Sequence, residues 1–446
     1  MNNQSHLNDL FEFLRIPSIS TDSAHRDDMQ RCASWLAAKF TAIGLQPQIH
    51  QTPGHPIVTA RNAHKTGRPT VLIYGHYDVQ PVDPLNLWHS NPFEPKLENG
   101  IITARGATDN KGQILAHILG VQEYLAANGE LPLNVIFLIE GEEEIGSPHL
   151  VPFLREHQRE LACDIVAISD TGMLEPGKGT MTYGLRGIAC LEITVSGPDK
   201  DLHSGIYGGA ITNPLTAISR LIATLHDANG KVAISGFYDD VAELEQWERE
   251  AWAKLPMKDA DILNLTGSPS LAPEKGYSAL ECTWGRPTAE LNGIYGGYQG
   301  EGSKTVIPSA AHAKISFRLV PSQDPDNILS LAEQHLQKHC PPGVTLTVTK
   351  GHSGAAYRLD PNIGFGKAAQ RALSLAFPGK DPALVREGGS IPIVADFKKI
   401  LGVDTLLLGL ALPDARIHSP NETFTVENFE GGIRLNQILL QELAKQ

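Results

Sequence analysis

The chain has 446 residues, more than one hydrophobic core normally accommodates, so its length predicts two domains. Apolar residues make up 41% and charged residues 20% of the sequence, an ordinary soluble globular balance. The formal net charge of −13 argues against a nucleic-acid partner, because binding to phosphates requires a basic face.

Targeting and redox signals point to the cytoplasm. The first residues, MNNQSH, contain no basic region followed by an apolar one, so they do not resemble a secretory signal. No stretch reaches the roughly 18 uninterrupted apolar residues of a membrane helix, and we expect no membrane partner. The scattered cysteines lack C-x-x-C spacing, which favours free thiols in a reducing compartment. They are Cys32, Cys163, Cys190, Cys282 and Cys340.

The first part of the chain alternates helical and strand-like segments. The expected helices span 6–16, 28–43, 110–127 and 147–159, and the expected strands span 46–50, 56–60, 69–74, 133–139 and 165–170. Three of these strands are almost wholly apolar, as expected for strands covered on both faces. The alternation therefore predicts a mostly parallel sheet flanked by helices, an α/β fold.

The pattern changes near residue 185 and changes back near 356. Strands at 189–195, 313–319 and 344–348 alternate apolar and polar residues, and helical runs at 213–227 and 324–339 lie between them. Alternation favours an antiparallel sheet with helices on one side. We therefore expect an inserted α+β domain at 186–355. After it, helices at 362–376, 391–401 and 426–444 and a buried strand at 405–409 complete the first domain, 1–185 plus 356–446.

Residues that bind metals or transfer protons follow the buried strands. His76 and Asp78 follow the strand at 69–74, the run 142–144 of three glutamates follows the strand at 133–139, and Asp170 closes the strand at 165–170. Open α/β sheets place their sites at the carboxyl ends of their strands. These residues therefore predict a site at one edge of the sheet.

Each candidate also has a plain structural explanation. A histidine near an aspartate is common at a surface, Asp109 at the start of a helix fits an N-cap, and adjacent glutamates can form a solvated loop. His418, which follows the last buried strand, is also more often structural when considered alone. Together, however, these groups predict metal ions with oxygen and imidazole ligands and a carboxylate base beside them.

Four segments resemble the signatures of one family. They are GHYDVQP at 75–81, GATDNKG at 106–112, EGEEEIGS at 140–147 and HSPNE at 418–422. The chain resembles the di-metal exopeptidases that include carnosinase-type dipeptidases, aminoacylase, carboxypeptidase G and succinyl-diaminopimelate desuccinylase. The resemblance covers nearly the whole chain, and Asp at position 170 favours the carnosinase-type branch. It implies a catalytic domain interrupted by a lid domain, which mediates dimerisation in many members.

The resemblance implies two Zn²⁺ ions per subunit, with Mn²⁺ or Co²⁺ as alternatives. His76 and Asp170 would hold one ion, and Glu144 and His418 would hold the other. Asp109 would bridge the two ions, and the peptide bond that follows it is expected to be cis.

The resemblance also implies the catalytic groups. Asp78 would orient His76, and Glu143 would act as the general base. A water held between the two metals would be the nucleophile, and Glu143 would pass its proton to the leaving amine. Glu142 occupies a position that is not usually acidic in the family.

The inserted domain supplies further candidates. His203, in DLHSG at 201–205, resembles the family histidine that acts in the partner subunit's site, so we expect a homodimer. Arg318 resembles the residue that binds the carboxylate of the substrate, and its planar fork suits that task. The candidate substrate-binding residues are Arg318, Thr305, His352, Gly389 and Ser390.

The expected function is metal-dependent hydrolysis of dipeptides or short peptides that carry a free carboxylate. The main alternative is an N-acyl amino acid deacylase or carbamoylase that uses the same metals and base. A non-catalytic scaffold on the same fold should have lost ligands or the base, and none is missing here. A glycosidase that uses the glutamate run would be active in the presence of a chelator.

Overall fold

The computed structural model describes residues 3–389 and 391–446. The chain forms two compact units. The first comprises Met1–Tyr183, Leu359–Val385 and Asp396–Gln446, and the second comprises Gly184–Arg358 and Arg386–Ala395. None of the helices in the described part of the chain is long and apolar enough to cross a membrane.

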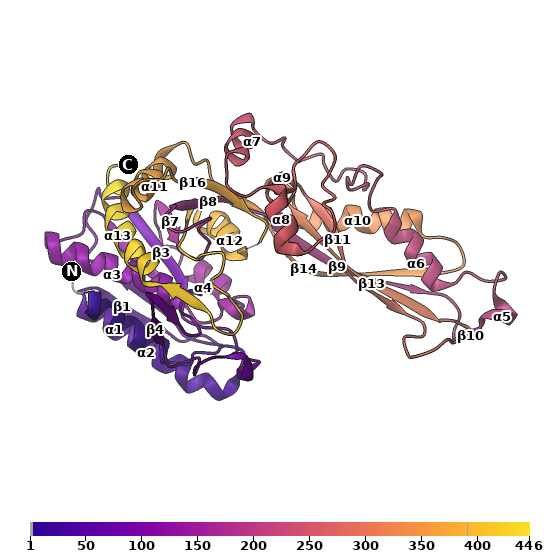
Figure 1. The fold of residues 1–446 in the computed structure, drawn as a ribbon, viewed down its shortest axis with the longest axis horizontal. Coiled ribbons are helices and arrows are strands. Elements are labelled where there is room, and N and C mark those ends of the chain that lie inside the picture. Colours follow the sequence, from indigo (N-terminus) through magenta and orange to yellow (C-terminus); the bar gives the residue numbers. More distant parts are fainter. Residues whose placement is uncertain (1–2, 390) are drawn as a thin grey trace. The chain divides into compact units, whose positions relative to one another are not determined.

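A nine-stranded sheet forms the centre of the first unit (Figure 1). Its strands are β1 (Gln46–His50), β2 (Ile57–Arg61), β3 (Thr70–His76), β6 (Asn134–Glu140), β7 (Ile165–Ile168), β8 (Thr180–Leu185), β15 (Tyr357–Arg358), β16 (Ala383–Glu387) and β17 (Thr405–Gly409). Their order is β1-β2-β6-β3-β7-β17-β8-β15, with β16 paired to β8.

The centre of this sheet is parallel and its flanks are antiparallel. β6, β3, β7 and β17 run parallel and are almost completely buried, as their apolar sequences predict. β2 is antiparallel to β6, and β8 is antiparallel to β17. The α/β class is therefore confirmed, but the sheet is mixed. At one flank β1 and β2 pair antiparallel, because the loop between them is too short for the crossover that a parallel pair needs.

Helices cover both faces of the sheet. They are α1 (Asn3–Leu14), α2 (Arg26–Ala42), α3 (Lys111–Asn128), α4 (Leu150–Glu156), α11 (Gly364–Ala376), α12 (Pro392–Leu401) and α13 (Val426–Leu443). Tyr74 of β3 packs against Phe397 of α12, whereas a Cβ at the next residue, Gly75, would lie 2.6 Å from Ile114 of α3. Because successive strand residues point to opposite faces, α12 and α3 cover opposite faces.

A small sheet holds the chain that returns after β17. It consists of β4 (Lys96–Glu98), β5 (Ile101–Thr103) and β18 (Thr423–Thr425), in the order β18-β5-β4. This pairing places the segment before β18 beside the loop after β5. The two segments carry His418 and Asp109, respectively.

The second unit is a four-stranded antiparallel sheet with helices on one face. Its sheet order is β11-β13-β9-β14, and α6 and α10 contact it from one side. The bounds are β9 (Gly187–Ser196), β10 (Leu202–His203), β11 (Thr288–Gly296), β12 (Val306–Ile307), β13 (Ala310–Leu319), β14 (Thr345–Gly354), α5 (Ser204–Tyr207), α6 (Pro214–Ala223), α7 (Gln246–Ala253), α8 (Asp259–Thr266), α9 (Ala279–Gly285) and α10 (Pro325–His339). Alternate residues of β9, such as Leu191 and Ile193, join the core with Leu221 of α6 and Leu329 of α10. The predicted antiparallel sheet is confirmed.

Candidate metal centre

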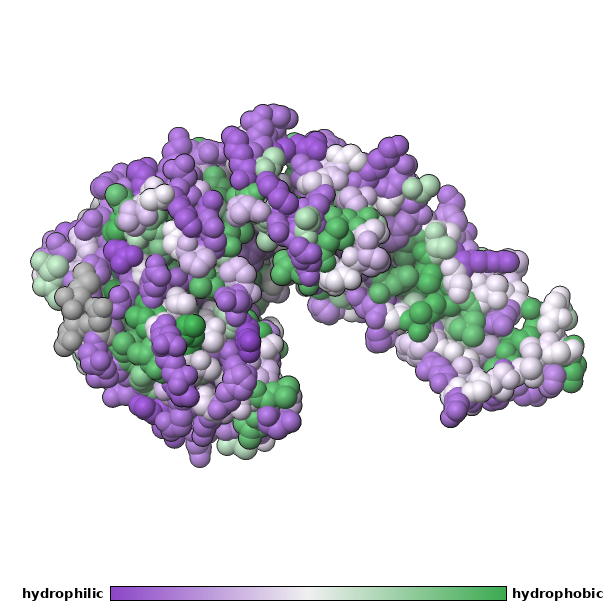
Figure 2. Space-filling model, viewed as in Figure 1, coloured by the Kyte–Doolittle hydropathy of each residue, from purple (hydrophilic) through white to green (hydrophobic). Residues whose placement is uncertain are grey.

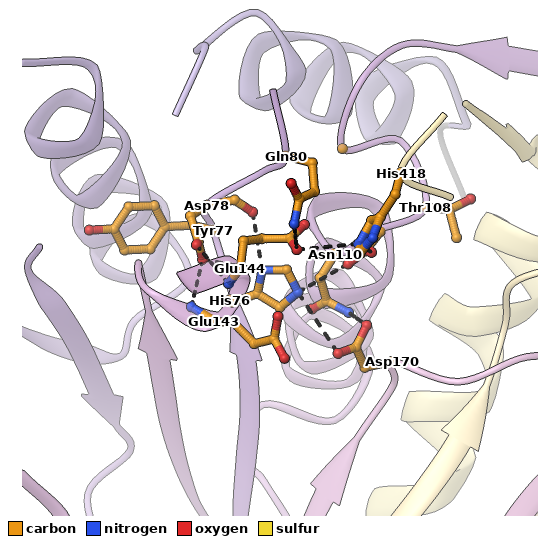
Figure 3. Close-up of polar contacts among 12 residues, drawn as sticks. His76, Tyr77, Asp78, Gln80, Thr108, Asn110, Glu143, Glu144, Asp170 and His418 are labelled. Carbon is orange, nitrogen blue, oxygen red and sulfur yellow. Dashed lines mark hydrogen bonds and ion pairs between the residues drawn. The ribbon is translucent and has the colours of Figure 1, made fainter. Parts of the chain in front are cut away.

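His76 closes β3 and is fully buried (Figure 3). Its Nδ1 lies 3.1 Å from the carbonyl oxygen and 3.3 Å from Oδ1 of Asp78, so this nitrogen carries the proton in the neutral ring. The bare Nε2 then faces Asp109 Oδ1 at 3.1 Å and Asp170 Oδ2 at 3.8 Å. A lone pair directed at two carboxylates is repulsive unless a cation or a proton lies between them.

Asp78 also fixes the turn that follows β6. Its two carboxylate oxygens accept hydrogen bonds from the backbone nitrogens of Glu143 at 3.2 Å and Glu144 at 3.1 Å. Gln80 Nε2 donates to Glu144 Oε2 at 2.7 Å. Glu144 Oε1 is buried and has no hydrogen-bond partner among the described residues. Because an unpaired buried acceptor is costly, this oxygen suits a metal ligand.

Asp109 precedes α3 and directs its two oxygens to opposite sides. Oδ1 faces His76, and Oδ2 lies 2.9 Å from Nε2 of His418. The Asp109–Asn110 peptide bond is cis, as the family resemblance implies. Asn110 Nδ2 donates to Asp170 Oδ1 at 2.8 Å and thereby orients that carboxylate.

His418 reaches the centre from the loop between β17 and β18. Its Nε2 lies 3.2 Å from Glu144 Oε2 in addition to its contact with Asp109. The residue adopts a positive φ of 60°, and Arg416 and Asn421 beside it also have positive φ. The His418 side chain is half exposed, whereas His76 is buried. The centre therefore has one enclosed side and one side open to solvent.

The ligand atoms form two groups that share one residue. The first group is His76, Asp109 and Asp170, and the second is Asp109, Glu144 and His418. Within each group, the ligand atoms lie within 4.8 Å of one another. Each group combines one imidazole nitrogen with carboxylate oxygens, which is a donor set that suits Zn²⁺. The residues therefore fit two cations with Asp109 between them.

Crowded charge perturbs the titration of this cluster. Burial raises the pKa of Glu143 to about 7. Burial, and then the neighbouring Asp109, raise the pKa of Asp170 well above its usual value. Hydrogen bonds to Asp109 and then to Glu144 raise the pKa of His418 to about 10. Bound cations would neutralise the negative charge that adds to the effect of burial.

Glu142 belongs to neither group of ligands. Its Oε1 accepts a hydrogen bond from the backbone of His55 at 3.0 Å, and Oε2 lies 2.7 Å from Nδ1 of His149. A Cβ at Gly54 would lie 1.7 Å from Glu142 Oε1, so any side chain at this position would displace the Glu142 carboxylate. The additional acid therefore anchors the loop between β1 and β2. In this register Glu144, two residues further on, faces His418.

The candidates in the second unit fall into two places. His203 and Thr305 lie together, because Ser204 N donates to the carbonyl of Thr305 at 3.1 Å. His203 is exposed, and its Nδ1 accepts a hydrogen bond from Gly205 N at 3.0 Å at the start of α5. Arg318 pairs with Ile188 across the sheet, on the face opposite the helices.

His352 shares that uncovered face. Its Nε2 lies 3.5 Å from the Sγ atom of Cys190, two residues along β9 from Ile188. Gly389 is exposed in the loop before α12, and Ser390 lies outside the described residues.

A model of Peptidase family M20/M25/M40 matches residues 72–442. The chain belongs to this family. Among its relatives, the Cys-Gly metallodipeptidase dug1 of Schizosaccharomyces pombe is 34% identical over 446 residues, which cover 96% of this chain and 93% of that protein. The Beta-Ala-His dipeptidase of Mus musculus is 31% identical over 423 residues, which cover 92% and 85%.

Solved structures of M20 proteins share the fold. The M20 family metallo-carboxypeptidase Sso-CP2 from Sulfolobus solfataricus matches with a TM-score of 0.84 and 33% identity, covering 99% of each chain. Human carnosine dipeptidase 1 matches with a TM-score of 0.75 and 28% identity, covering 100% of this chain and 97% of that one. These relatives confirm the resemblance to the carnosinase-type branch.

Two residues at the M20 centre were not singled out from the sequence. Gln80 donates to Glu144, and Glu422 accepts hydrogen bonds from the loop that carries Asp109. Both lie inside the segments that carry the resemblance, 75–81 and 418–422. Only Glu422 had a signal in the sequence, because it is an acidic residue four positions after the candidate ligand His418.

Proposed function

We propose that this M20 protein is a dinuclear metallodipeptidase that hydrolyses dipeptides or short peptides with a free carboxylate, with Zn²⁺ as its native ion. The observation that carries the proposal is the pair of ligand groups that share Asp109 while Glu143 stays outside both. The names of the relatives, Cys-Gly and Beta-Ala-His dipeptidases, support the substrate class.

The proposed metal ligands divide between the two ions. His76 and Asp170 would hold the first ion, Glu144 and His418 would hold the second, and Asp109 would be shared by both. Zn²⁺ at such a centre supplies Lewis acidity, which lowers the pKa of a water and polarises a carbonyl. Asp78 keeps the proton on Nδ1 of His76, so that Nε2 is free to coordinate.

Glu143 is the proposed general base. Its backbone is held by Asp78 in the same turn as Glu144, and Figure 3 shows its carboxylate beside the His76 ring. A carboxylate that is close to the ligands but belongs to neither group can accept a proton from the attacking water. It can then deliver that proton to the leaving amine.

The second unit is the proposed lid and substrate-binding domain. Arg318 binds the terminal carboxylate of the substrate through its guanidinium group, and His352 lies on the same face of the sheet. Gly389 contributes from the loop before α12, and the next residue in the sequence, Ser390, is proposed as a further contact. Thr305 lies beside His203 and acts with it.

We also propose a homodimer in which His203 acts in the partner's site and stabilises the oxyanion. Exposed apolar side chains support an interface on the second unit. Ile206 and Tyr207 of α5 and Ile294 of the edge strand β11 are 69%, 43% and 49% exposed. Figure 1 places α5 at one end of the second unit, and Figure 2 shows apolar residues at that end. Sedimentation that finds only a 48.3 kDa species with full activity would contradict the dimer.

The test of the function is hydrolysis of a dipeptide panel before and after chelation, and again after Zn²⁺ or Mn²⁺ is returned. Activity that is lost on chelation and restored by metal supports the proposal. N-acetyl and N-carbamoyl amino acids belong in the same panel. Faster cleavage of those compounds than of any dipeptide would replace the dipeptidase with a deacylase or carbamoylase. A cytoplasmic location stays a prediction from the sequence.

A further inference from the structure

Glu422 is a fully buried carboxylate that accepts hydrogen bonds from one short loop. Its Oε1 accepts from the backbone nitrogens of Thr108 at 2.8 Å and Asp109 at 2.9 Å. Its Oε2 accepts from Gly106 N at 3.0 Å and from Nη1 of Arg105 at 2.9 Å. Three backbone donors and one guanidinium group therefore converge on a single side chain.

The loop depends on this carboxylate for its shape. Gly106 adopts a φ of +82°, and a Cβ there would lie 2.8 Å from Val79. This turn directs the N–H groups of Gly106, Thr108 and Asp109 toward one point, an arrangement that binds anions. Arg105 is 1% exposed, and its second amino group donates to the carbonyl of Pro81 at 2.9 Å. Without Glu422, a buried cation and three N–H groups would lose their common acceptor.

Glu422 also anchors the segment that carries His418. Its own backbone carbonyl accepts a hydrogen bond from Ala104 N at 3.1 Å, and Thr108 Oγ1 donates to the carbonyl of Thr423 at 2.6 Å. The preceding residue, Asn421, accepts from His89 N at 2.8 Å. Just before these anchors in the chain, the half-exposed His418 side chain has ion-pair contacts with the two carboxylates of its ligand group.

We propose that Glu422 is a positioning residue that sets the geometry of the second cation site, Asp109–Glu144–His418, by locking the His418 segment onto the loop of Asp109. The inference rests on the proposed dinuclear function. The two sites share Asp109, but the other ligands of the first site have supports that do not involve Glu422, because Asp78 fixes His76 and Asn110 fixes Asp170. Loss of Glu422 should therefore weaken the second cation more than the first.

The test is metal binding by Glu422→Gln, measured without substrate. Apo protein is titrated with Zn²⁺ against a chromophoric chelator, and Co²⁺ absorption spectra report the ligand geometry. We expect the second equivalent to bind about 10- to 100-fold more weakly than in the wild type, as for other residues that orient ligands, and the first equivalent to lose much less affinity. Wild-type affinity for both equivalents, or an equal loss for both, overturns the proposal.

The matched control is Glu442→Gln in α13. Glu442 is also a mostly buried glutamate of the first unit that pairs with an arginine, because its Oε2 lies 2.7 Å from Nε of Arg371. It lies in a helix and not in the segments that carry the proposed metal ligands. This variant should bind both equivalents as the wild type does. If it showed the same selective loss, the effect of Glu422→Gln would be a general consequence of losing a buried charge, and the proposal would fail.

A double variant separates positioning from charge compensation. In Arg105→Gln/Glu422→Gln the buried cation is removed together with its partner, so urea stability should recover relative to Glu422→Gln alone. If Glu422 acts through the backbone N–H groups, the second cation still binds weakly in this variant. If the affinity for the second cation recovered, Glu422 would act only as a counter-charge for Arg105, and the proposal would fail. Because these readouts are independent of hydrolysis, a failure of the dipeptidase assay is distinguishable from a failure here.

Discussion

His117 gives the chain an acid-sensitive core that does not depend on its metals. The ring lies in the middle of α3, fully buried, with Nε2 2.9 Å from the hydroxyl oxygen of Ser169. Its Nδ1 has no hydrogen-bond partner among the described residues. Burial lowers the pKa of His117 to about 3, because the charged ring would lose its hydration without gaining a counter-ion.

The depressed pKa makes the folded chain less stable in acid. In the unfolded chain the ring titrates near 6.5, so between about pH 6.5 and pH 3 the unfolded state binds a proton that the folded state does not. Stability therefore falls as the pH is lowered through this window. With about 1.36 kcal/mol for each pKa unit, His117 alone should cost about 2 kcal/mol between pH 7 and pH 5.

Urea unfolding of the wild type and of His117→Gln at pH 7 and pH 5 tests this value. Both proteins are measured with excess chelator, because the pH dependence of metal binding would otherwise contribute to the change in stability. The variant should be less stable at pH 7, since glutamine fills the ring's space poorly, but it should lose about 2 kcal/mol less on acidification. The exposed His64→Gln is the control and should behave as the wild type. Equal losses in His117→Gln and the wild type would refute the reasoning.

Three further predictions concern the centre. Glu143→Gln should lower kcat/KM about 10²- to 10⁴-fold while the metal content stays unchanged by elemental analysis, whereas a loss of metal would make Glu143 a ligand. Glu143→Gln subunits mixed with His203→Ala subunits should recover up to about a quarter of wild-type activity, because mixed dimers contain one intact composite site. No recovery would assign His203 to its own subunit's site. Chelation should lower the melting temperature in scanning calorimetry, because ions that bind only the folded chain stabilise it. An unchanged melting temperature would contradict a folded metal centre.

The sequence predicted the elements best where local composition decides the structure. The apolar runs at 69–74, 133–139 and 405–409 became the buried strands β3, β6 and β17, and the alternating run at 189–195 lies in β9. In each case the consecutive residues of the strand show whether both of its faces are buried or only one. The direction of the flanking strands was not predicted, because pairing partners lie far apart in the sequence.

The same contrast holds within the centre. His76, Asp109 and Glu144 could be proposed because they lie in recognisable segments at strand or helix ends. The role of Glu422 could not, because its four donors are 313 to 317 positions away and three of them belong to the backbone. Backbone donors carry no residue identity, so the residue sequence does not reveal which side chain they will bind.

The insertion of the second unit is compatible with a centre assembled from distant segments. Four of the five proposed ligands precede the insertion, and His418 follows it. The chain leaves along β8 and returns along β15, and Gly184 pairs directly with Arg358 at that point. Because the two ends of the insertion are neighbours, the first unit does not have to stretch to contain it. The later ligand then needs only a local anchor, which is supplied by the contact of Asn421 with His89 and by the contacts of Glu422 with the loop 105–109.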